Sequence, residues 1–405
     1  MSSIHHLVEL SDEPRLRQHV TGIRLEVELI HENLREEEWR NKVQAYGTRT
    51  VESDSSDDWS GKPKHDALLA QERDSLSVEE IAKCWKRLQV GMTEQEELQK
   101  HSMSSLMDML TPAFAQLPAL RFFTCNAMSL SKHVTESNKL RRLQGETLTY
   151  PPLTKDPRPG DVLFITTYAT ACLASLLDVR PEISSVSMAM FPWNVLVKLS
   201  NYWQSSSKSP DLSNLTSMRL YTICREPFTD TTQAEGMEAI TTMLSTAPDL
   251  IQFNWGHGPE CMGPEIDDYV NLQIPNFFDF DEPCLLASLD LGGVSCEFDE
   301  LYELLDRVSG SLESLDLGSM SLNGGYGFDM FNHMHDSMDL FHFGIRGRLE
   351  DWDGVRGRAW DPGSIQDYVI WVNEREPLQS SDEGGSPGVW MIMSDSSLRY
   401  DSVYS

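Results

Sequence analysis

Residues 288–292 read SLDLG, and the same five letters return 26 positions later at 314–318. Each copy completes a pattern of three apolar positions, L-x-x-L-x-L, and a third copy of the pattern follows after another 26 positions. The three sets are Leu286-Leu289-Leu291, Leu312-Leu315-Leu317 and Met338-Phe341-Phe343. Alternation of apolar and polar residues is typical of a strand with one buried face. The constant period predicts a repeated unit that buries its apolar face against its neighbours, as in a solenoid.

The same apolar pattern occurs less regularly elsewhere in the chain. The further sets are Leu117-Leu120-Phe122, Ile183-Val186-Met188, Leu215-Met218-Leu220, Leu250-Phe253-Trp255 and Ile365-Tyr368-Ile370. Amphipathic helices are expected in three segments between these sets, because their apolar residues have helical spacing. The segments are 168–178, 232–247 and 298–310. A helix that connects two neighbouring strands makes those strands parallel. The sequence therefore predicts an α/β fold, an irregular solenoid with a ribbon of parallel strands and helices on its outer face.

Composition along the chain predicts four regions. They are an N-terminal helix-strand region at 1–46, an acidic disordered loop at 47–66, a solenoid at 67–378 and a C-terminal tail at 379–405. Within the third region, a helix is expected at 75–91 with Ser77 as its N-cap. A second helix is expected at 103–117, interrupted by Pro112.

The composition also limits the class of protein. With 40% hydrophobic and 9% aromatic residues among 405, the chain can build a sizeable core. Its formal net charge of −30 disfavours nucleic acid and anionic membranes as partners. No run of about 18 apolar residues predicts a membrane span, and the first residues lack the apolar segment of a signal peptide. The seven cysteines form no C-x-x-C pair, which predicts buried, reduced thiols in a cytoplasmic or nuclear protein.

The L-x-x-L-x-L strand, followed by a helix in steps of 26 residues, resembles a leucine-rich repeat. The chain is also similar in texture to fungal families of F-box and leucine-rich-repeat-like proteins. The segments that carry this similarity are PEISSVSM (181–188), LSNLTSMRL (212–220), APDLIQFNW (247–255) and SGSLESLDLG (309–318). The opening LSDEPRLRQHVTGIRLEV (10–27) resembles the stretch that follows the F-box in those proteins. IQDYVIWVNEREPL (365–378) is similar to their terminal segment.

This resemblance implies a protein–protein interaction module rather than an enzyme. In that family the role is a substrate-recognition adaptor of cullin-type ubiquitin ligases, which is attached through the F-box. No F-box is found before Leu7 in this sequence. The adaptor function is therefore what the resemblance implies, and the F-box that would attach it to a ligase is not found in this chain.

The strand residues that alternate with the buried ones point to the opposite face of the ribbon. An extended face of this kind binds partners in repeat proteins. The candidate partner-binding residues are Arg219, Tyr221, Gln252, Asn254, Asp290, Asp316 and His342. In this alignment His342 stands beside Asp316, and Leu340 beside Ser314. The alternative is that these are ordinary solvent-facing polar residues. The sequence names no partner and leaves the oligomeric state open.

One cluster of residues indicates a different class of function. His333 and His335, followed directly by Asp336, resemble part of the ligand set of a metal-dependent hydrolase. The cluster is expected in the turn before a strand, where polar residues are common. Residues 384–388 (GGSPG) match G-x-S-x-G, but their Gly/Ser/Pro-rich surroundings are typical of a flexible segment and not of a nucleophile elbow. We assign no catalytic residue, no metal ligand and no cofactor.

Overall fold

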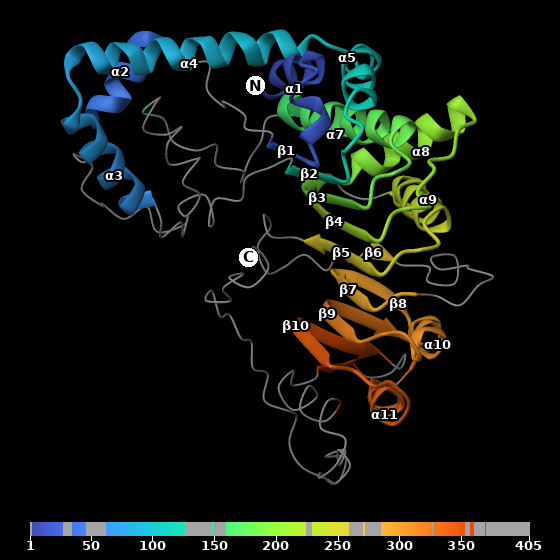
Figure 1. Ribbon diagram of the computed structural model, residues 1–405. Coiled ribbons are helices and arrows are strands. Elements are labelled where there is room, and N and C mark those ends of the chain that lie inside the picture. The colour runs from blue at the N-terminus through green and yellow to red at the C-terminus, as the bar shows by residue number, and fades with distance from the viewer. Residues whose placement is uncertain are drawn as a thin grey trace. The chain divides into compact units, whose positions relative to one another are not determined.

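The computed structural model of the chain describes residues 2–26, 35–45, 62–126, 148, 159–223, 229–258, 270–271, 285–325, 327–352, 357–359 and 369. The chain divides into two compact units. The N-terminal unit comprises Met1–Leu250 and Gly258–Asp268, and the C-terminal unit comprises Ile251–His257 and Tyr269–Ser405. Figure 1 shows that strands alternate with helices along much of the chain.

In the described part of the N-terminal unit, four parallel strands pair in chain order. They are β1 (Gly22–Glu26), β2 (Phe122–Asn126), β3 (Ser185–Pro192) and β4 (Ser217–Ile223). The register aligns Ile23, Phe123, Val186 and Met218 across the four strands. Because aligned positions share a face, these apolar side chains form one layer under the sheet.

The strands of the C-terminal unit follow the same rule. They are β5 (Gln252–Gly258), β6 (Val270–Asn271), β7 (Ser288–Gly292), β8 (Val294–Glu297), β9 (Ser314–Asn323), β10 (His342–Trp352) and β11 (Gly357–Ala359). Strands β5, β7, β9 and β10 are parallel neighbours, and their register aligns Phe253, Leu289, Leu315 and Phe343. The short strand β8 pairs in parallel with β6 and β9, and β11 is antiparallel to β10. The predicted α/β class with a mostly parallel sheet is therefore confirmed.

Helices precede most of these strands. Those of the N-terminal unit are α1 (Ser2–Asp12), a 3-10 helix (Arg17–His19), α2 (Glu36–Ala45), α3 (Lys62–Ser75), α4 (Val78–Gln99), α5 (Met103–Ala115), α7 (Pro159–Val179), α8 (Asn194–Ser206) and α9 (Asp230–Ser245). Those of the C-terminal unit are α10 (Phe298–Val308) and α11 (Gly327–Ser337). Helices α7, α8 and α9 lie along one side of the N-terminal strands, and α10 and α11 lie along one side of the C-terminal strands (Figure 1).

The predicted N-cap of α4 and the apolar face of α10 are confirmed, although α4 continues to Gln99, past the predicted end at 91. Ser77 and Glu80 form a reciprocal capping box at the start of α4, which satisfies two backbone donors that have no partner inside the helix. In α10 the predicted apolar face is buried, and its members are Leu301, Leu304, Leu305 and Val308. Each such side chain contributes about 1.5–3 kcal/mol when it leaves water. Helix α10 therefore holds its position by packing against the sheet rather than by helix propensity alone.

Helix α7 has the length and composition of a membrane span, which the sequence analysis did not anticipate. Its segment Val162–Val179 has a mean hydropathy of 1.7, and 78% of it is buried inside the protein. Helix α7 packs against both α5 and α8. Its apolar character is therefore explained by its position between other helices of the core.

Two predicted boundaries were wrong. Helix α3 begins at Lys62, so the last residues of the expected loop 47–66 are helical, and 46–61 lie outside the described residues. Pro112 does not interrupt α5, because the helix continues to Ala115. Only the last turn lies beyond the proline, so few backbone hydrogen bonds are affected.

Two further segments of the sequence-based scheme were not tested. The expected repeat at 365–370 is described only at Val369, and the tail 379–405 lies outside the described residues. The helices α2, α3 and α4 enclose a small core of their own around the rings of Trp39 and Trp85, whose centroids are 5.4 Å apart and whose planes are tilted by 40°. This cluster has no counterpart in the repeat pattern.

Two of the apolar sets have the wrong register. The structure pairs Phe343 with Leu315 and Ile345 with Leu317, so the last unit is Leu340-Phe343-Ile345, two residues later than predicted. Phe341, assigned to the core, is 78% exposed. Similarly, Phe122 is 55% exposed, and the buried set there is Leu120-Phe123-Cys125. The prediction failed because both alternative frames contain three apolar residues at the required offsets.

Candidate binding surface

The register of each unit is set where the chain enters its strands. A single carbonyl before each strand accepts backbone N–H groups from two consecutive residues of the next repeat. Thr21 O accepts from the N–H of Arg121 and Phe122 at 2.9 and 3.1 Å, and Ile251 O accepts from the N–H of Ala287 and Ser288 at 2.8 and 3.0 Å. The same arrangement recurs at the carbonyls of Arg121, Ser184, Ala287 and Glu313. Equivalent positions of successive strands are thereby held in straight rows.

We call the sheet face that is turned away from the helices the open face (Figure 1), and we define a rim where the chain enters the strands and two rows on the face itself. The rim is the residue before each strand, namely Thr21, Arg121, Ser184 and Thr216 in the N-terminal unit and Ile251, Ala287, Glu313 and Phe341 in the C-terminal unit. The first row of the N-terminal unit is Gly22, Phe122, Ser185 and Ser217. The first row of the C-terminal unit is Gln252, Ser288, Ser314 and His342. The central row of the N-terminal unit is Arg24, Thr124, Ser187 and Arg219. The central row of the C-terminal unit is Asn254, Asp290, Asp316 and Gly344.

The seven predicted binding residues are divided between the two units. Arg219 and Tyr221 lie half-buried on β4. The other five, Gln252, Asn254, Asp290, Asp316 and His342, lie together on the open face of the C-terminal unit. His342 stands beside Ser314 and not beside Asp316, because β10 is shifted by two residues from the predicted frame. A shift of two keeps the side chain on the same face, so His342 remains a surface residue.

The carboxylate of Asp316 organises the end of the central row. Its Oδ2 lies 3.3 Å from Nε2 of His342, with the side chains 26% and 57% exposed respectively. Gly344 leaves room for this carboxylate, because a Cβ at that position would overlap Asp316 Oδ1. The Asp316 side chain therefore leans across the neighbouring strand toward His342, and its charge remains accessible to solvent.

Asn254 starts the same row. Its Oδ1 is buried and has no hydrogen-bond partner among the described residues. The register places Asn254 next to Asp290. The central row of the C-terminal unit thus combines an amide with two carboxylates, and all three are groups that can accept hydrogen bonds.

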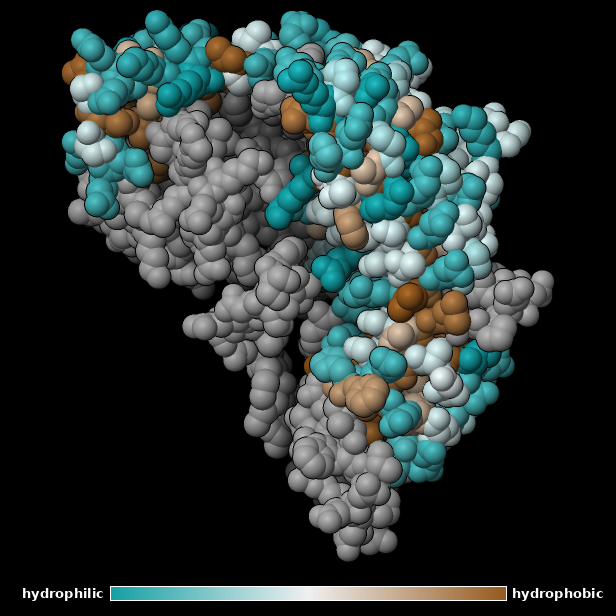
Figure 2. All heavy atoms as spheres, in the orientation of Figure 1, coloured by the Kyte–Doolittle hydropathy of each residue, from teal (hydrophilic) through white to brown (hydrophobic). Residues whose placement is uncertain are grey.

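Sequence reasoning missed the rim of the C-terminal unit. Ile251 is 46% exposed, Phe341 is 78% exposed, and Leu285, just before β7, is 52% exposed. Figure 2 shows apolar side chains at the surface over the strands of this unit. The signal in the sequence that could have revealed this rim is an apolar residue directly before each strand pattern. At Phe341 the sequence analysis assigns that residue to the core.

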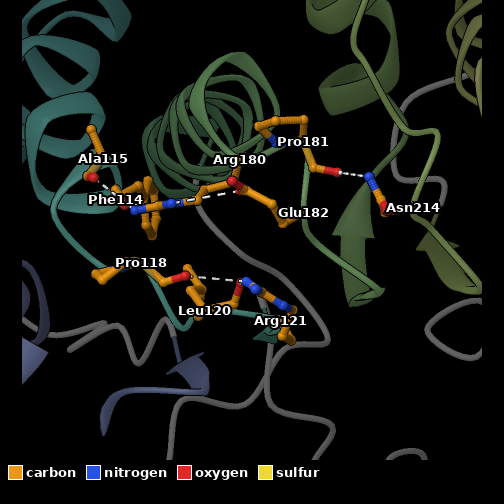
Figure 3. Close-up of polar contacts among 9 residues, drawn as sticks. All are labelled: Phe114, Ala115, Pro118, Leu120, Arg121, Arg180, Pro181, Glu182 and Asn214. Atoms are coloured by element: carbon orange, nitrogen blue, oxygen red, sulfur yellow. Dashed lines mark hydrogen bonds and ion pairs between the residues drawn. The ribbon is translucent and has the colours of Figure 1, made fainter. Parts of the chain in front are cut away.

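The rim of the N-terminal unit is polar, and its side chains bond to the chain itself. Ser184 Oγ donates to Arg121 O and Thr216 Oγ1 donates to Ser184 O, both at 3.1 Å. Arg121 Nη1 donates to the carbonyls of Pro118 and Leu120 at 3.2 and 2.9 Å (Figure 3). These contacts satisfy carbonyls in the turns between helix and strand.

Arg180 supports the same turns from inside the N-terminal unit (Figure 3). It follows α7, and its Nε and Nη2 donate to the carbonyls of Phe114 and Ala115 at the end of α5, both at 2.7 Å. Desolvation by burial lowers the pKa of the guanidinium, and the nearby Glu182 carboxylate partly opposes that shift. A cation is favourable at a helix C-terminus, so Arg180 acts as a structural cap.

The cluster considered as an alternative metal site does not assemble. His333, His335 and Asp336 lie on helix α11 and not in a turn. The ring of His333 stacks on Tyr302 of α10 at 4.4 Å, whereas Nδ1 of His335 lies 2.8 Å from Oδ1 of Asp336. Residues two apart on a helix point about 200° apart. In the described parts of the chain, no three His, Cys, Asp or Glu side chains converge to hold a metal ion.

The described thiols belong to the core. The four described cysteines, Cys84, Cys125, Cys172 and Cys296, are buried, and none of them forms a disulfide. Burial raises the pKa of the Cys125 and Cys296 thiols to about 12 and raises that of Cys172 well above its usual value. A thiol is nucleophilic only as the thiolate, so these side chains pack as small apolar groups.

Comparison with known proteins gives no further guide. No protein-family model matches the chain, and no curated protein matches it significantly. The function is therefore inferred from the residues of the open face.

Proposed function

We propose that the chain is a protein-recognition module built as an irregular solenoid of leucine-rich-repeat type, and that the open face of the C-terminal unit is its main binding surface. The observation that carries this proposal is the register of β5, β7, β9 and β10. It arranges the side chains of four strands in rows on a face that the helices leave uncovered. Repeat folds bind extended partners on such faces.

The chemistry of the face favours a protein partner. The central row is acidic and the chain carries a net charge of −30, so nucleic acid would be repelled. The rim beside it exposes Ile251 and Phe341 together with the charged side chain of Glu313. Exposed apolar side chains bordered by polar ones are common at protein interaction sites.

Photo-crosslinking tests the proposal. A benzophenone amino acid replaces Ser288, a half-buried residue on the open face, and the protein is irradiated in an extract of cells that express it. The matched control has the same probe at Glu303, which is exposed on α10. We expect a protein adduct from position 288 that is absent from position 303 and absent when Asp290→Arg and Asp316→Arg are added. Equal adducts from both positions would show that the open face has no special role.

Within this function, we propose on the sequence resemblance alone that the partner is a ligase substrate and that the chain acts as an adaptor. The segments that carry the resemblance to F-box and leucine-rich-repeat-like proteins include the entries to β3, β4, β5 and β9. Two of these entries, those of β5 and β9, belong to the binding surface described above. Purification of the intact protein under mild conditions tests this step. Cullin-ligase subunits in stoichiometric amounts are expected, and their absence while an open-face partner is retained would leave a binding module that is not a ligase adaptor.

A further inference from the structure

The rim of the C-terminal unit presents apolar side chains on a rigid edge. Ile251 and Phe341 directly precede β5 and β10, and both are exposed. Backbone hydrogen bonds hold this edge in place, since Ile251 O accepts two N–H groups and Phe341 N–H donates to Glu313 O at 2.9 Å. With strands about 4.8 Å apart, three steps separate Ile251 from Phe341 by roughly 14 Å. That distance suits an extended segment of a partner lying across the strands.

Negative charge lies beside the apolar rim. Glu313 is exposed in the rim itself, and Asp290 and Asp316 lie three residues further along their strands, which is about 10 Å. His342 contacts Asp316, and Arg346 is the residue of β10 in register with Gly318. The side chain of Arg346 lies outside the described residues. The carboxylates of Glu313, Asp290 and Asp316 thus lie at or beside the rim.

A strip without side chains follows the two aspartates. Gly256, Gly292 and Gly318 are partners across three neighbouring strands. A Cβ on Gly292 would lie 3.3 Å from the carbonyl oxygen of Gly318, so the backbones approach closely here. Gly256 and Gly292 are half-buried and Gly318 is buried, so a bound chain can approach the sheet most closely at the first two, next to Asp290.

From this combination we infer that the C-terminal unit binds an extended peptide segment of its partner that carries both apolar and basic side chains. The apolar side chains cover Ile251, Leu285 and Phe341, and a lysine or arginine reaches the carboxylates of Asp290 and Asp316. The inference rests on the proposed function and adds the chemistry of the partner. The N-terminal unit does not fit the same segment, because Arg24 and Arg219 occupy its central row.

A randomised peptide display library, selected against the intact protein, tests the inference. We expect enriched peptides with lysine or arginine near leucine or phenylalanine. Peptides made from that selection are then measured by fluorescence anisotropy at low and high salt. The Asp290→Asn/Asp316→Asn variant should lose at least about tenfold in affinity, as expected when a charged contact is removed. It should also lose most of the salt dependence.

Two further variants separate the contributions. Phe341→Ser should weaken binding while the salt dependence is retained, because it removes apolar contact only. Asp299→Asn/Glu303→Gln removes two exposed charges from α10 and should change affinity less than about twofold, because exposed charges at a distance are screened. Thermal unfolding midpoints of all variants, compared with the parent, establish that each is folded.

Three results would overturn the inference. They are no enriched peptide, enriched peptides without an excess of basic residues, or equal binding by the Asp290→Asn/Asp316→Asn and Asp299→Asn/Glu303→Gln variants. The last result would mean that the overall negative charge, and not this surface, attracts basic peptides. None of them affects the photo-crosslinking result at position 288, so a failure of the inference remains distinct from a failure of the proposed function.

Discussion

The two units place the same strand positions in the same rows but use them differently. In the N-terminal unit the rim is polar, and Arg121, Ser184 and Thr216 bond to carbonyls of neighbouring turns. In the C-terminal unit the rim carries Ile251 and Phe341, which are exposed. The central rows differ as well, with arginines in the first unit and carboxylates in the second.

The difference separates structural side chains from those left for a partner. A rim side chain that donates to a turn carbonyl stabilises its own unit. A rim side chain that is apolar and exposed has no such function inside the fold, and it gains free energy only when another surface covers it. The N-terminal unit also exposes Phe122, in its first row. The contrast therefore concerns the rim and the central row.

The largest expected loss of stability comes from a substitution at Gly293, in the C-terminal unit. Gly293 has φ +69°, and a Cβ there would overlap the backbone carbonyl of His257. Gly293→Ala should lower the free energy of unfolding by at least about 3 kcal/mol, since strain and overlap add. Urea denaturation measures it. Gly310→Ala is the control, because nothing lies within 4 Å of its Cβ position, and equal effects of the two changes would contradict this account of Gly293.

His257 should make the C-terminal unit sensitive to acid. Burial lowers its pKa from 6.5 to about 4, so the folded protein holds the ring neutral while the unfolded chain takes up a proton. Stability from this group is fully present above pH 6.5 and is lost as the pH falls toward 4, by about 3 kcal/mol at most. Unfolding free energies of the parent and His257→Gln between pH 4 and 7 measure it. Parallel curves for the two proteins would contradict the assignment.

Replacement of Arg180 should lower the stability of the N-terminal unit. Arg180→Leu leaves the carbonyls of Phe114 and Ala115 without donors, and should cost about 2–3 kcal/mol of unfolding free energy. Arg180→Lys keeps the charge but has a different donor geometry, and should fall between leucine and the parent. Chemical denaturation followed by circular dichroism gives the order. A leucine variant as stable as the parent would show that the guanidinium does not act as a cap.

The smallest effects sharpen the comparison of the rims. Thr216→Val removes the hydrogen bond to Ser184 O and should cost about 1 kcal/mol. Phe341→Ser removes an exposed ring and should change stability by less than about 0.5 kcal/mol. Thermal unfolding of both variants tests the pair. If Phe341→Ser were the more destabilising change, the ring would belong to the core of the C-terminal unit.

Much of the fold could be predicted from the sequence because the strands show an alternation of apolar and polar residues. The L-x-x-L-x-L sets at Leu286 and Leu312 locate β7 and β9, and the shared SLDLG gives their register. The set at Met338 was placed two residues too early. Both frames, at Met338 and at Leu340, have apolar residues at all three offsets, so periodicity alone does not distinguish them.

The candidate surface was partly predictable for the same reason. Asp290 and Asp316 follow from the pattern directly. The rim was missed because its residue type changes from one unit to the next, from Ile251 to Ala287, Glu313 and Phe341, so no common residue marks it. The alternative metal cluster was placed in a turn because α11 was not predicted, although Met330, Met334 and Met338 are all buried at helical spacing.

The most direct test of the account compares the same row in the two units. Ser185 and Ser314 are both half-buried serines of the first row. The same benzophenone probe is placed at each position in turn, the protein is irradiated in cell extract, and adducts are identified by mass spectrometry. The account predicts a specific protein adduct from position 314 and little or none from position 185. A specific adduct from position 185 alone, or equal adducts from both, would contradict it.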